Sequence, residues 1–279
     1  MIRIGLFGAN GRMGQSILSV MASAGELSNE ISLGCALVRP GHGLNATQIS
    51  SLNALGQEAY YSSDVTDGFS KSDVMIDFTL PEATKENLSL AQDRMTPMVI
   101  GTTGIGPEEH RLMESLAKQV PVFYDTNMSL GVAVLKHLVH EATRMLGDEF
   151  DCDIFESHHR YKKDIPSGTA MSLGEEVARA RGNQLKDLGT RRFNSKDPSA
   201  IQTMHEHKIS EVGFSAVRGG GVFGDHDVIF SSDQEQVKLS HRALNRDVFA
   251  KGALTAAKWI VNQPPGLYSM KDLLAFKGI

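Results

Sequence analysis

The first fourteen residues constrain the fold more than any other part of the chain. Residues 2–7 read IRIGLF, the pattern of a buried strand, and residues 8–14 read GANGRMG, a glycine-rich turn. Apolar residues then recur at helical spacing through Met13, Ile17 and Val20. A strand, a glycine turn and a helix in this order are typical of dinucleotide-binding units, because glycines let the backbone approach a pyrophosphate closely. The spacing GxxGxxG is a variant of the commoner GxGxxG, and the alternative is a plain tight turn between strand and helix.

The rest of the N-terminal half continues the alternation of strands and helices. Candidate strands lie at 2–7, 32–38, 74–79, 98–102 and 121–125. Pro81 and Pro107 stand just inside the starts of two helices, where proline is tolerated. Such alternation predicts a mostly parallel, doubly wound sheet, whose ligands lie beyond the carboxyl ends of the strands. The predicted fold class is therefore α/β, with a Rossmann-type sheet.

The pattern changes after residue 126. Residues 130–146 carry an apolar stripe that predicts a packed connecting helix, formed by Val132, Leu135, Leu138, Val139, Ala142, Met145 and Leu146. One helix, at about 168–181, lies among strand-like segments at 151–158, 209–218, 226–232 and 235–241. Residues 180–197 are polar and basic and predict a loop, and residues 248–262 return to a helical pattern. We therefore expect a smaller α+β domain with a mixed or antiparallel sheet after the first domain.

Composition excludes several classes of protein. The 279 residues carry 28 basic and 33 acidic side chains, a net charge of −5, which argues against a nucleic-acid partner. No apolar run approaches the ~18–20 residues of a membrane span, and the N-terminus reads as a strand rather than a signal peptide. Only two cysteines occur, Cys35 and Cys152, both in strand-like segments. We expect a reduced, cytoplasmic protein without a catalytic thiol.

The strongest chemical signal is the run ESHHRYKKDIPSGTA at 156–170. Two histidines, one arginine and two lysines lie within eight residues, and Ser167-Gly168-Thr169 follows as a helix start. A helix N-terminus offers free backbone N–H groups and a positive dipole end, so it binds anions. His158 and Lys162 add groups that can deliver protons. The segment therefore predicts a site for a small, multiply charged acid; the alternative is a solvated basic turn before a helix cap.

Five motifs in order carry a resemblance to a known family. They are GANGRMG at 8–14, GTTG at 101–104, NMSLGV at 127–132, the run SHHRYKKDIPSGTA at 157–170, and RGGGVFGDH at 218–226. Over nearly its full length the chain resembles the 4-hydroxy-tetrahydrodipicolinate reductase (dihydrodipicolinate reductase) family of lysine and diaminopimelate biosynthesis. The resemblance implies NAD(P)H-dependent reduction of 4-hydroxy-tetrahydrodipicolinate, or of its dehydrated form, to tetrahydrodipicolinate. It also implies a dinucleotide-binding domain over 1–128, completed by 241–279, and a substrate-binding and oligomerisation domain over 129–240.

The resemblance also assigns roles to residues. It makes His158 and Lys162 the acid/base pair, places His159 on one substrate carboxylate, and gives the other to the backbone of Gly168 and Thr169. The family usually has histidine where Tyr161 stands, a departure that we expect to affect only the rim of the site. The cofactor is expected to contact Gly8, Ala9, Asn10, Gly11, Arg12, Met13, Arg39, Gly101, Thr102, Thr103, Asp125, Thr126, Asn127 and Met128.

The end of the second strand predicts a preference for NADPH over NADH. In a Rossmann unit this point meets the adenine ribose, where an acid favours NADH and an arginine accommodates the 2′-phosphate. Here Val38 stands where family members that use both cofactors have an acid, and Arg39 follows. Arg39, helped by Arg12, would bind the phosphate. The alternative is that Arg39 lies in solvent and Val38 only packs under the adenine.

Several possibilities stay open. His205-Glu206-His207 could hold a metal, but no third ligand is near, so we expect no metal site. Arg218 either reaches the substrate or locks the sheet. The resemblance implies a homotetramer, and apolar positions at 209–214 and 228–230 support it if they need a partner surface. Rival functions are another Rossmann oxidoreductase, such as an amino-acid or semialdehyde dehydrogenase, and a non-catalytic NADP sensor.

Overall fold

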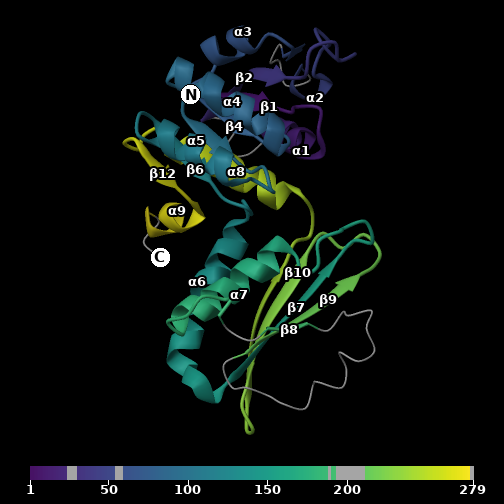
Figure 1. Cartoon of the computed structure of the whole chain (residues 1–279). Coiled ribbons are helices and arrows are strands. Elements are labelled where there is room, and N and C mark those ends of the chain that lie inside the picture. The colour runs from purple at the N-terminus through teal and green to yellow at the C-terminus, as the bar shows by residue number, and fades with distance from the viewer. Residues whose placement is uncertain (24–29, 54–58, 188–189, 193–210, 277–279) are drawn as a thin grey trace. The chain divides into compact units, whose positions relative to one another are not determined.

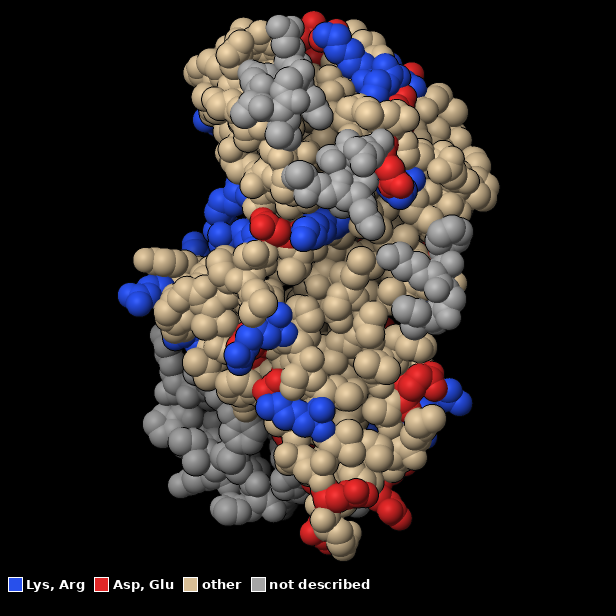
Figure 2. Space-filling model, turned by 180° about the vertical axis from the view of Figure 1, so that it is seen from behind, with Lys and Arg blue, Asp and Glu red and all other residues tan. Residues whose placement is uncertain are grey.

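The computed structural model describes residues 1–23, 30–53, 59–187, 190–192 and 211–276 (Figure 1). The chain divides into two compact units. Unit 1 comprises Met1–Leu130 with Arg246–Ile279, and unit 2 comprises Gly131–Asn245. None of the described helices is long and apolar enough to span a membrane. On the face shown in Figure 2, basic and acidic side chains of the described residues are interspersed, and no broad surface carries one sign of charge.

Unit 1 is built on a seven-stranded sheet in which every pairing is parallel. The strand order is β12-β6-β5-β4-β1-β2-β3, so the order reverses between β1 and β4. This arrangement confirms the predicted doubly wound sheet. Its strands are β1 (Ile2–Phe7), β2 (Ile31–Leu37), β3 (Tyr61–Ser62), β4 (Val74–Asp77), β5 (Met98–Ile100), β6 (Pro121–Tyr124) and β12 (Gly266–Tyr268).

Helices cover this sheet, and two of them begin at the predicted prolines. The helices of unit 1 are α1 (Arg12–Ala22), α2 (Ser50–Asn53), α3 (Val65–Ser70), α4 (Pro81–Arg94), α5 (Pro107–Ala117), α8 (Asp247–Ile260) and α9 (Met270–Phe276). Pro81 and Pro107 occupy first-turn positions, where a missing N–H costs nothing. The helix predicted at 248–262 is α8, and it packs against α1, β4, β5 and β6. Its alanines and Gly252 are buried, so α8 approaches its neighbours closely.

Unit 2 contains a five-stranded mixed sheet in the order β11-β10-β7-β9-β8. β10 is antiparallel to both β7 and β11, whereas β9 is parallel to β7 and β8. The prediction of a loop throughout 180–197 was wrong at Thr190–Arg192, because these three residues pair with β9 as an edge strand. The elements are α6 (Leu130–Leu146), the 3-10 turn η2 (Gly147–Glu149), β7 (Asp151–His158), α7 (Gly168–Ala180), β8 (Thr190–Arg192), β9 (Val212–Arg218), β10 (Asp225–Ser231) and β11 (Gln236–Arg242).

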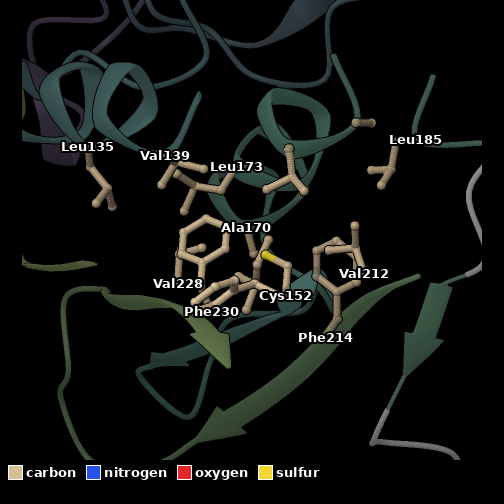
Figure 3. Close-up of a cluster of buried hydrophobic side chains, with 14 residues drawn as sticks. Leu135, Val139, Cys152, Ala170, Leu173, Leu185, Val212, Phe214, Val228 and Phe230 are labelled. Atoms are coloured by element: carbon tan, nitrogen blue, oxygen red, sulfur yellow. The ribbon is translucent and has the colours of Figure 1, made fainter. Parts of the chain in front are cut away.

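The core of unit 2 lies between its sheet and the helices α6 and α7 (Figure 3). Leu135 and Val139 from α6 and Leu173 from α7 point toward side chains of β7, β9 and β10. The apolar stripe predicted on α6 is only partly buried. Leu138 is 46 % exposed and Met145 is 83 % exposed, because the stripe is wider than the sheet surface beneath it.

The apolar strand positions that seemed to need a partner surface are used inside unit 2. Val212, Phe214, Val228 and Phe230 all lie in the core under the two helices. The opposite face of the sheet is mainly polar and carries, for example, the Asp227–Lys238 ion pair of 2.6 Å. These four side chains are therefore covered within the chain, whereas Ile229 points to the opposite face and is half-buried, so the homotetramer stays a prediction. Ile209 and Ser210 lie outside the described residues.

Candidate active site

The glycine turn at the end of β1 has the geometry that its sequence predicts. Gly8 adopts a φ of +66°, in the left-handed region, and its carbonyl accepts a hydrogen bond of 2.9 Å from the Gly11 amide. Gly14 lies where α1 crosses this turn. A Cβ there would stand 2.7 Å from the carbonyl carbon of Ala9, so only glycine allows this contact. The turn therefore brings the backbone of residues 8–14 into one tight loop.

The N-terminus of α1 fits an anionic group. Its N-cap is Gly11, and no side chain caps the free amides of the first turn. Their positive dipole end is therefore available to a pyrophosphate. Beside the turn, the Asn10 side chain is hydrogen-bonded to His42 Nε2 at 3.0 Å, which ties the turn to the loop after β2. The local geometry fits the dinucleotide predicted for Gly8 to Met13.

The guanidinium groups of two arginines near this turn have no partner among the residues that the structure describes. Arg12 and Arg39 are exposed, and their side chains make no hydrogen bond or ion pair within that part of the chain. Val38 is 4 % exposed and packs into the core. An unpaired guanidinium at the end of β2 is available to a phosphate, whereas Val38 offers nothing to a ribose hydroxyl.

A buried acid supports the turn after β5. Asp77 ends β4, is fully buried, and accepts hydrogen bonds from the Thr79 amide at 2.8 Å and from Asn87 Nδ2 at 3.0 Å. The hydroxyl of Thr102 donates to the same carboxylate at 3.4 Å. Gly101 and Thr102 are buried and Thr103 is exposed at the end of this turn. The sequence placed this segment at the sheet edge but gave Asp77 no role.

The segment after β6 rests on the C-terminal helices of the same unit. Asp125 Oδ1 accepts a hydrogen bond from the Asn127 amide, and its Oδ2 accepts one from the Met270 amide at the start of α9, each 3.2 Å long. A Cβ on Gly252 would stand 2.8 Å from the carbonyl carbon of Met128. The backbone of residues 125–128, with exposed Thr126 among them, is therefore fixed by α8 and α9.

In unit 2, the 156–170 segment leaves β7 and enters α7, as predicted. β7 ends at His158, which is 7 % exposed, and α7 begins at Gly168. The Ser167 side chain caps α7 by accepting a hydrogen bond of 3.2 Å from the Ala170 amide. The predicted anion-binding turn is therefore a capped helix start. Tyr161, at 80 % exposure, lies at the rim of this segment.

Lys162 has a partner within the same loop. Its Nζ lies 2.9 Å from Asp164 Oδ2. Burial alone would raise the pKa of Asp164, but the hydrogen bond and charge of Lys162, together with the Gly168 amide, lower it. Asp164 thus pairs with Lys162, one of the groups to which the resemblance assigns a role in the reaction. His159 and Thr169 are half-buried beside them.

Glu156 is the centre of this site, although the sequence gave it no role. Its carboxylate accepts hydrogen bonds from His158 Nδ1, from the Ser167 amide at 3.0 Å and from both terminal nitrogens of Arg218, at 2.8 and 2.7 Å. Burial alone would raise the pKa of Glu156, but His158 and Arg218 outweigh it and lower that pKa to about 2. Arg218 therefore locks β9 to β7 and to the Asp164 carbonyl, which it also contacts at 2.7 Å.

His226 on β10 is the second residue that the sequence did not place in the site. It is 3 % exposed, and its Nε2 lies 3.1 Å from Ser167 Oγ. Its ring meets the His158 ring edge to face, with centroids 5.1 Å apart. Burial, and next the charge of His158, lower the pKa of His226 to about 3, so this imidazole is neutral. His226 ends the RGGGVFGDH motif at 218–226, but no local signal connects it to Ser167.

The predicted substrate-site and cofactor-site residues lie in different units. His158, His159, Lys162, Gly168 and Thr169 share one segment of unit 2, and the predicted cofactor residues all belong to unit 1. His205-Glu206-His207 lies outside the described residues. Within the described ones, no group of three His, Cys, Asp or Glu side chains is placed to hold a metal.

Comparison with known proteins identifies the family. Residues 2–128 match the model of the dihydrodipicolinate reductase N-terminus, and residues 131–274 match that of its C-terminus. The 4-hydroxy-tetrahydrodipicolinate reductase of a Nitratiruptor species is 40% identical over 98% of this chain and 99% of its own. That of Geobacter sulfurreducens is 39% identical over 99% and 100%.

A solved structure shows the same fold. The dipicolinate-bound dihydrodipicolinate reductase from Paenisporosarcina sp. TG-14 superposes with a TM-score of 0.71 at 22% identity, and the match covers 98% of this chain and 99% of that one. The family models and the relatives together confirm the resemblance seen in the sequence. The chain belongs to the dihydrodipicolinate reductase family.

Proposed function

We propose that this chain reduces 4-hydroxy-tetrahydrodipicolinate, or its dehydrated form, to tetrahydrodipicolinate with NADPH. The observation that carries the proposal is the 156–170 segment, in which a buried histidine, a lysine and a helix N-terminus follow one another. The family membership and the names of the relatives support it. The test is NADPH consumption with the freshly made condensation product of pyruvate and aspartate semialdehyde. The proposal would be refuted if NADPH were oxidised no faster with this substrate than without it.

The proposed substrate is a dianion, and the segment supplies matching positive groups. The amides of Gly168 and Thr169 open α7 and bind one carboxylate, while His159 binds the other. Dipoles and cations that are fixed in advance stabilise the negative charge that reduction creates, because they need not reorganise during the reaction. Asp164 indicates that a carboxylate fits beside Lys162, since its own carboxylate lies 2.9 Å from Nζ of that lysine.

The chemistry needs one hydride and one proton for each ring reduced, and the hydroxylated substrate also loses water. The nicotinamide cofactor, when bound, supplies the hydride. His158 and Lys162 deliver the proton to the neighbouring ring atom. When a substrate carboxylate displaces Asp164, the ion pair between Asp164 and Lys162 breaks. The ammonium of Lys162 is then free to donate a proton.

We assign the cofactor site to the ends of the unit 1 strands. The turn of Gly8 to Gly11 and the free amides of Arg12 and Met13 hold the pyrophosphate. Backbone groups of Gly101 to Thr103 and of Asp125 to Met128 contact the nicotinamide end. Asp77 supports the first of these segments through its hydrogen bond with Thr102, and Gly252 packs against the second at Met128.

We further propose that NADPH is preferred and that NADH is the weaker cofactor. Arg39 is exposed and unpaired among the described residues, and Val38 cannot accept a ribose hydrogen bond. A charge-assisted bond to the 2′-phosphate is worth roughly 1.5–3 kcal/mol, or about 10- to 100-fold in affinity. The test compares kcat/KM for both cofactors at one salt concentration, for the wild type and for Arg39→Ala. Equal values in the wild type, or an unchanged KM for NADPH in the variant, would refute the preference.

A semialdehyde dehydrogenase of the acylating type is disfavoured by the cysteines. Such enzymes need an activated thiol. Burial raises the pKa of Cys35 to about 11 and that of Cys152 to about 12, so neither thiol is reactive at neutral pH. A non-catalytic sensor would have no need of the proton-delivering pair of His158 and Lys162.

The assembly and the compartment follow from the proposed family role. We propose a homotetramer that associates through unit 2, whose sheet is covered on one face by α6 and α7. Light scattering at micromolar concentration tests it, and a monomer mass would refute it. We place the enzyme in the cytoplasm, since both cysteines are free.

A further inference from the structure

Glu156 is a buried ionised group that the proposed reaction does not use directly. Its side chain is 1 % exposed. Oε1 accepts hydrogen bonds from the Ser167 amide and Arg218, and Oε2 accepts them from His158 and Arg218. A carboxylate has about four acceptor positions, and four donors occupy them here. Glu156 therefore has no capacity left for a substrate and acts only through its partners.

Those partners belong to two different parts of the site. His158 is the proposed proton donor, and Ser167 is the N-cap of α7, whose first amides are proposed to hold a substrate carboxylate. One oxygen of Glu156 holds each of them. A second path joins the same two parts, because His226 bonds Ser167 and packs against the His158 ring.

We propose that Glu156 is a positioning residue that holds His158 and the start of α7 in a fixed position relative to each other. Oε2 keeps a proton on Nδ1 of His158, so that Nε2 is the nitrogen that exchanges a proton with the substrate. Oε1 keeps the Ser167 amide, and with it the anion-binding turn, at a fixed distance from that nitrogen. The inference rests on the proposed function, in which His158 and this turn meet the same substrate.

The surroundings of Nε2 agree with this assignment. Gly224 lies on that side, where a Cβ would stand 3.0 Å from Nε2. Glycine thus leaves the space beside Nε2 open. Nδ1, in contrast, is already hydrogen-bonded to Glu156.

Arg218, together with His158, stabilises the ionised form of Glu156. Its two terminal nitrogens bind both oxygens of the carboxylate, a bidentate geometry that lysine cannot reproduce. With this partner the carboxylate stays ionised despite burial, consistent with its low pKa. An ionised Glu156 accepts a hydrogen bond from Nδ1–H of His158 but does not remove that proton. The proton that is transferred is therefore the one on Nε2.

The decisive variant is Glu156→Gln in the full chain. Glutamine has the same shape but only one acceptor oxygen, so its NH₂ group must face either His158 or Ser167, both of which donate. We expect kcat to fall at least tenfold, while KM for NADPH changes less than twofold. In ¹⁵N-histidine NMR at alkaline pH, neutral His158 should carry its proton on Nδ1 in the wild type and shift toward Nε2 in the variant.

A matched control exists in the same unit. Glu176 also contacts a histidine, His140, at 3.5 Å, on helices away from the β7–α7 loop. Glu176→Gln makes the same chemical change and should leave kcat and the His158 tautomer unaltered. A purely structural Glu156 would lower the melting temperature of Glu156→Gln but leave the tautomer as in the wild type.

The outcomes separate this inference from the proposed function. If His158→Ala loses activity and folded Glu156→Gln keeps it, the positioning role is wrong and the function stands. If wild-type His158 carries its neutral proton on Nε2, the inference fails even where Glu156→Gln does not fold. If the wild type does not reduce the substrate, the function fails, and the same NMR measurement still decides the tautomer.

Discussion

The glycine turn of unit 1 and the Glu156 network of unit 2 are two candidate binding regions built from different parts of the chain. In the turn, glycines let the backbone fold tightly, and the proposed contacts are amides. In the network, a buried carboxylate joins side chains from β7, β9 and the start of α7. The first region therefore depends on the absence of side chains, and the second on the presence of particular ones. Substitutions should reveal this difference.

The largest effect should come from the proton-delivering side chains. Lys162→Ala and His158→Ala should each lower kcat about 10²- to 10⁴-fold, the usual contribution of a positioned proton donor. NADPH affinity should stay near that of the wild type, because the proposed cofactor contacts belong to the other unit. Steady-state kinetics and NADPH titration test both statements. Lys163→Ala removes the same charge from the next, exposed residue and should have little effect; near-wild-type kcat for His158→Ala or Lys162→Ala would contradict the assigned roles.

Gly14→Ala should damage unit 1 without any loss of a functional side chain. The added Cβ would meet the backbone of Ala9 and Gly8, which cannot move aside as a side chain can. Overpacking of this kind costs about 1–3 kcal/mol, and we expect weaker NADPH binding together with a lower urea midpoint. Gly43→Ala is the control, because a Cβ at Gly43 has no atom within 4 Å. Equal NADPH affinity in wild type and Gly14→Ala would show that the turn tolerates a side chain.

The buried neutral His226 should make unit 2 sensitive to acid. Its pKa is about 3 in the folded chain and roughly 6.5 when unfolded, so between these values the unfolded state binds the extra proton. Stability should therefore fall as pH decreases from 6.5, by at most about 1.4 kcal/mol per pH unit from this residue. Glu156, with its pKa lowered to about 2, contributes only below about pH 4.5, so between about pH 6.5 and 4.5 His226 acts without Glu156.

Urea unfolding at pH 7.5, 6 and 5 measures this dependence. His226→Gln should give a shallower loss of stability over that interval than the wild type. His137→Gln, on the exposed side of α6, is the matched control and should keep the wild-type slope. An identical slope in His226→Gln would show that the buried imidazole is not the source.

The smallest effect should come from Asp164. Its carboxylate is paired with Lys162, so a substrate carboxylate that approaches this lysine must displace it. Asp164→Asn removes this competitor and should lower KM for the substrate a few-fold, since an exposed ion pair is worth about 0–1 kcal/mol. Glu175→Gln, an exposed acid on α7, controls for the change in net charge. A KM that rises or stays the same in Asp164→Asn would refute the competition.

The two regions also differ in how much of their structure could be predicted from the sequence. The turn and the strands β1, β2, β4, β5 and β6 were predicted because each is encoded locally, in alternation and in glycine spacing. β3 and β12 were missed because no apolar run marks them, whereas β5, which is as short as β12, consists of three apolar residues. The start of α7 was predicted from Ser167 and Gly168 for the same local reason.

The Glu156 network could not be predicted because its partners meet only through the sheet. Arg218 lies 62 residues from Glu156, and His226 lies 59 from Ser167. Their pairing depends on β9 and β10 flanking β7, an order that no local pattern specifies. The exposure of Leu138 and Met145 has a similar cause: a helical stripe does not say how wide a surface will cover it.

Unit 1 is completed by α8 and β12, which follow unit 2 in the chain, and this affects the order in which the units can fold during synthesis. α8 buries its alanines against α1 and three strands, and β12 forms the sheet's last edge. A ribosome adds about 5–20 residues per second, so the whole of unit 2 is synthesised, over roughly ten seconds, before α8 exists. During that time the nascent nucleotide-binding unit exposes the apolar surface that α8 will cover. The contiguous unit 2 is therefore free to fold first, and α1, which is made before unit 2, meets its partner α8 only after unit 2 has been made.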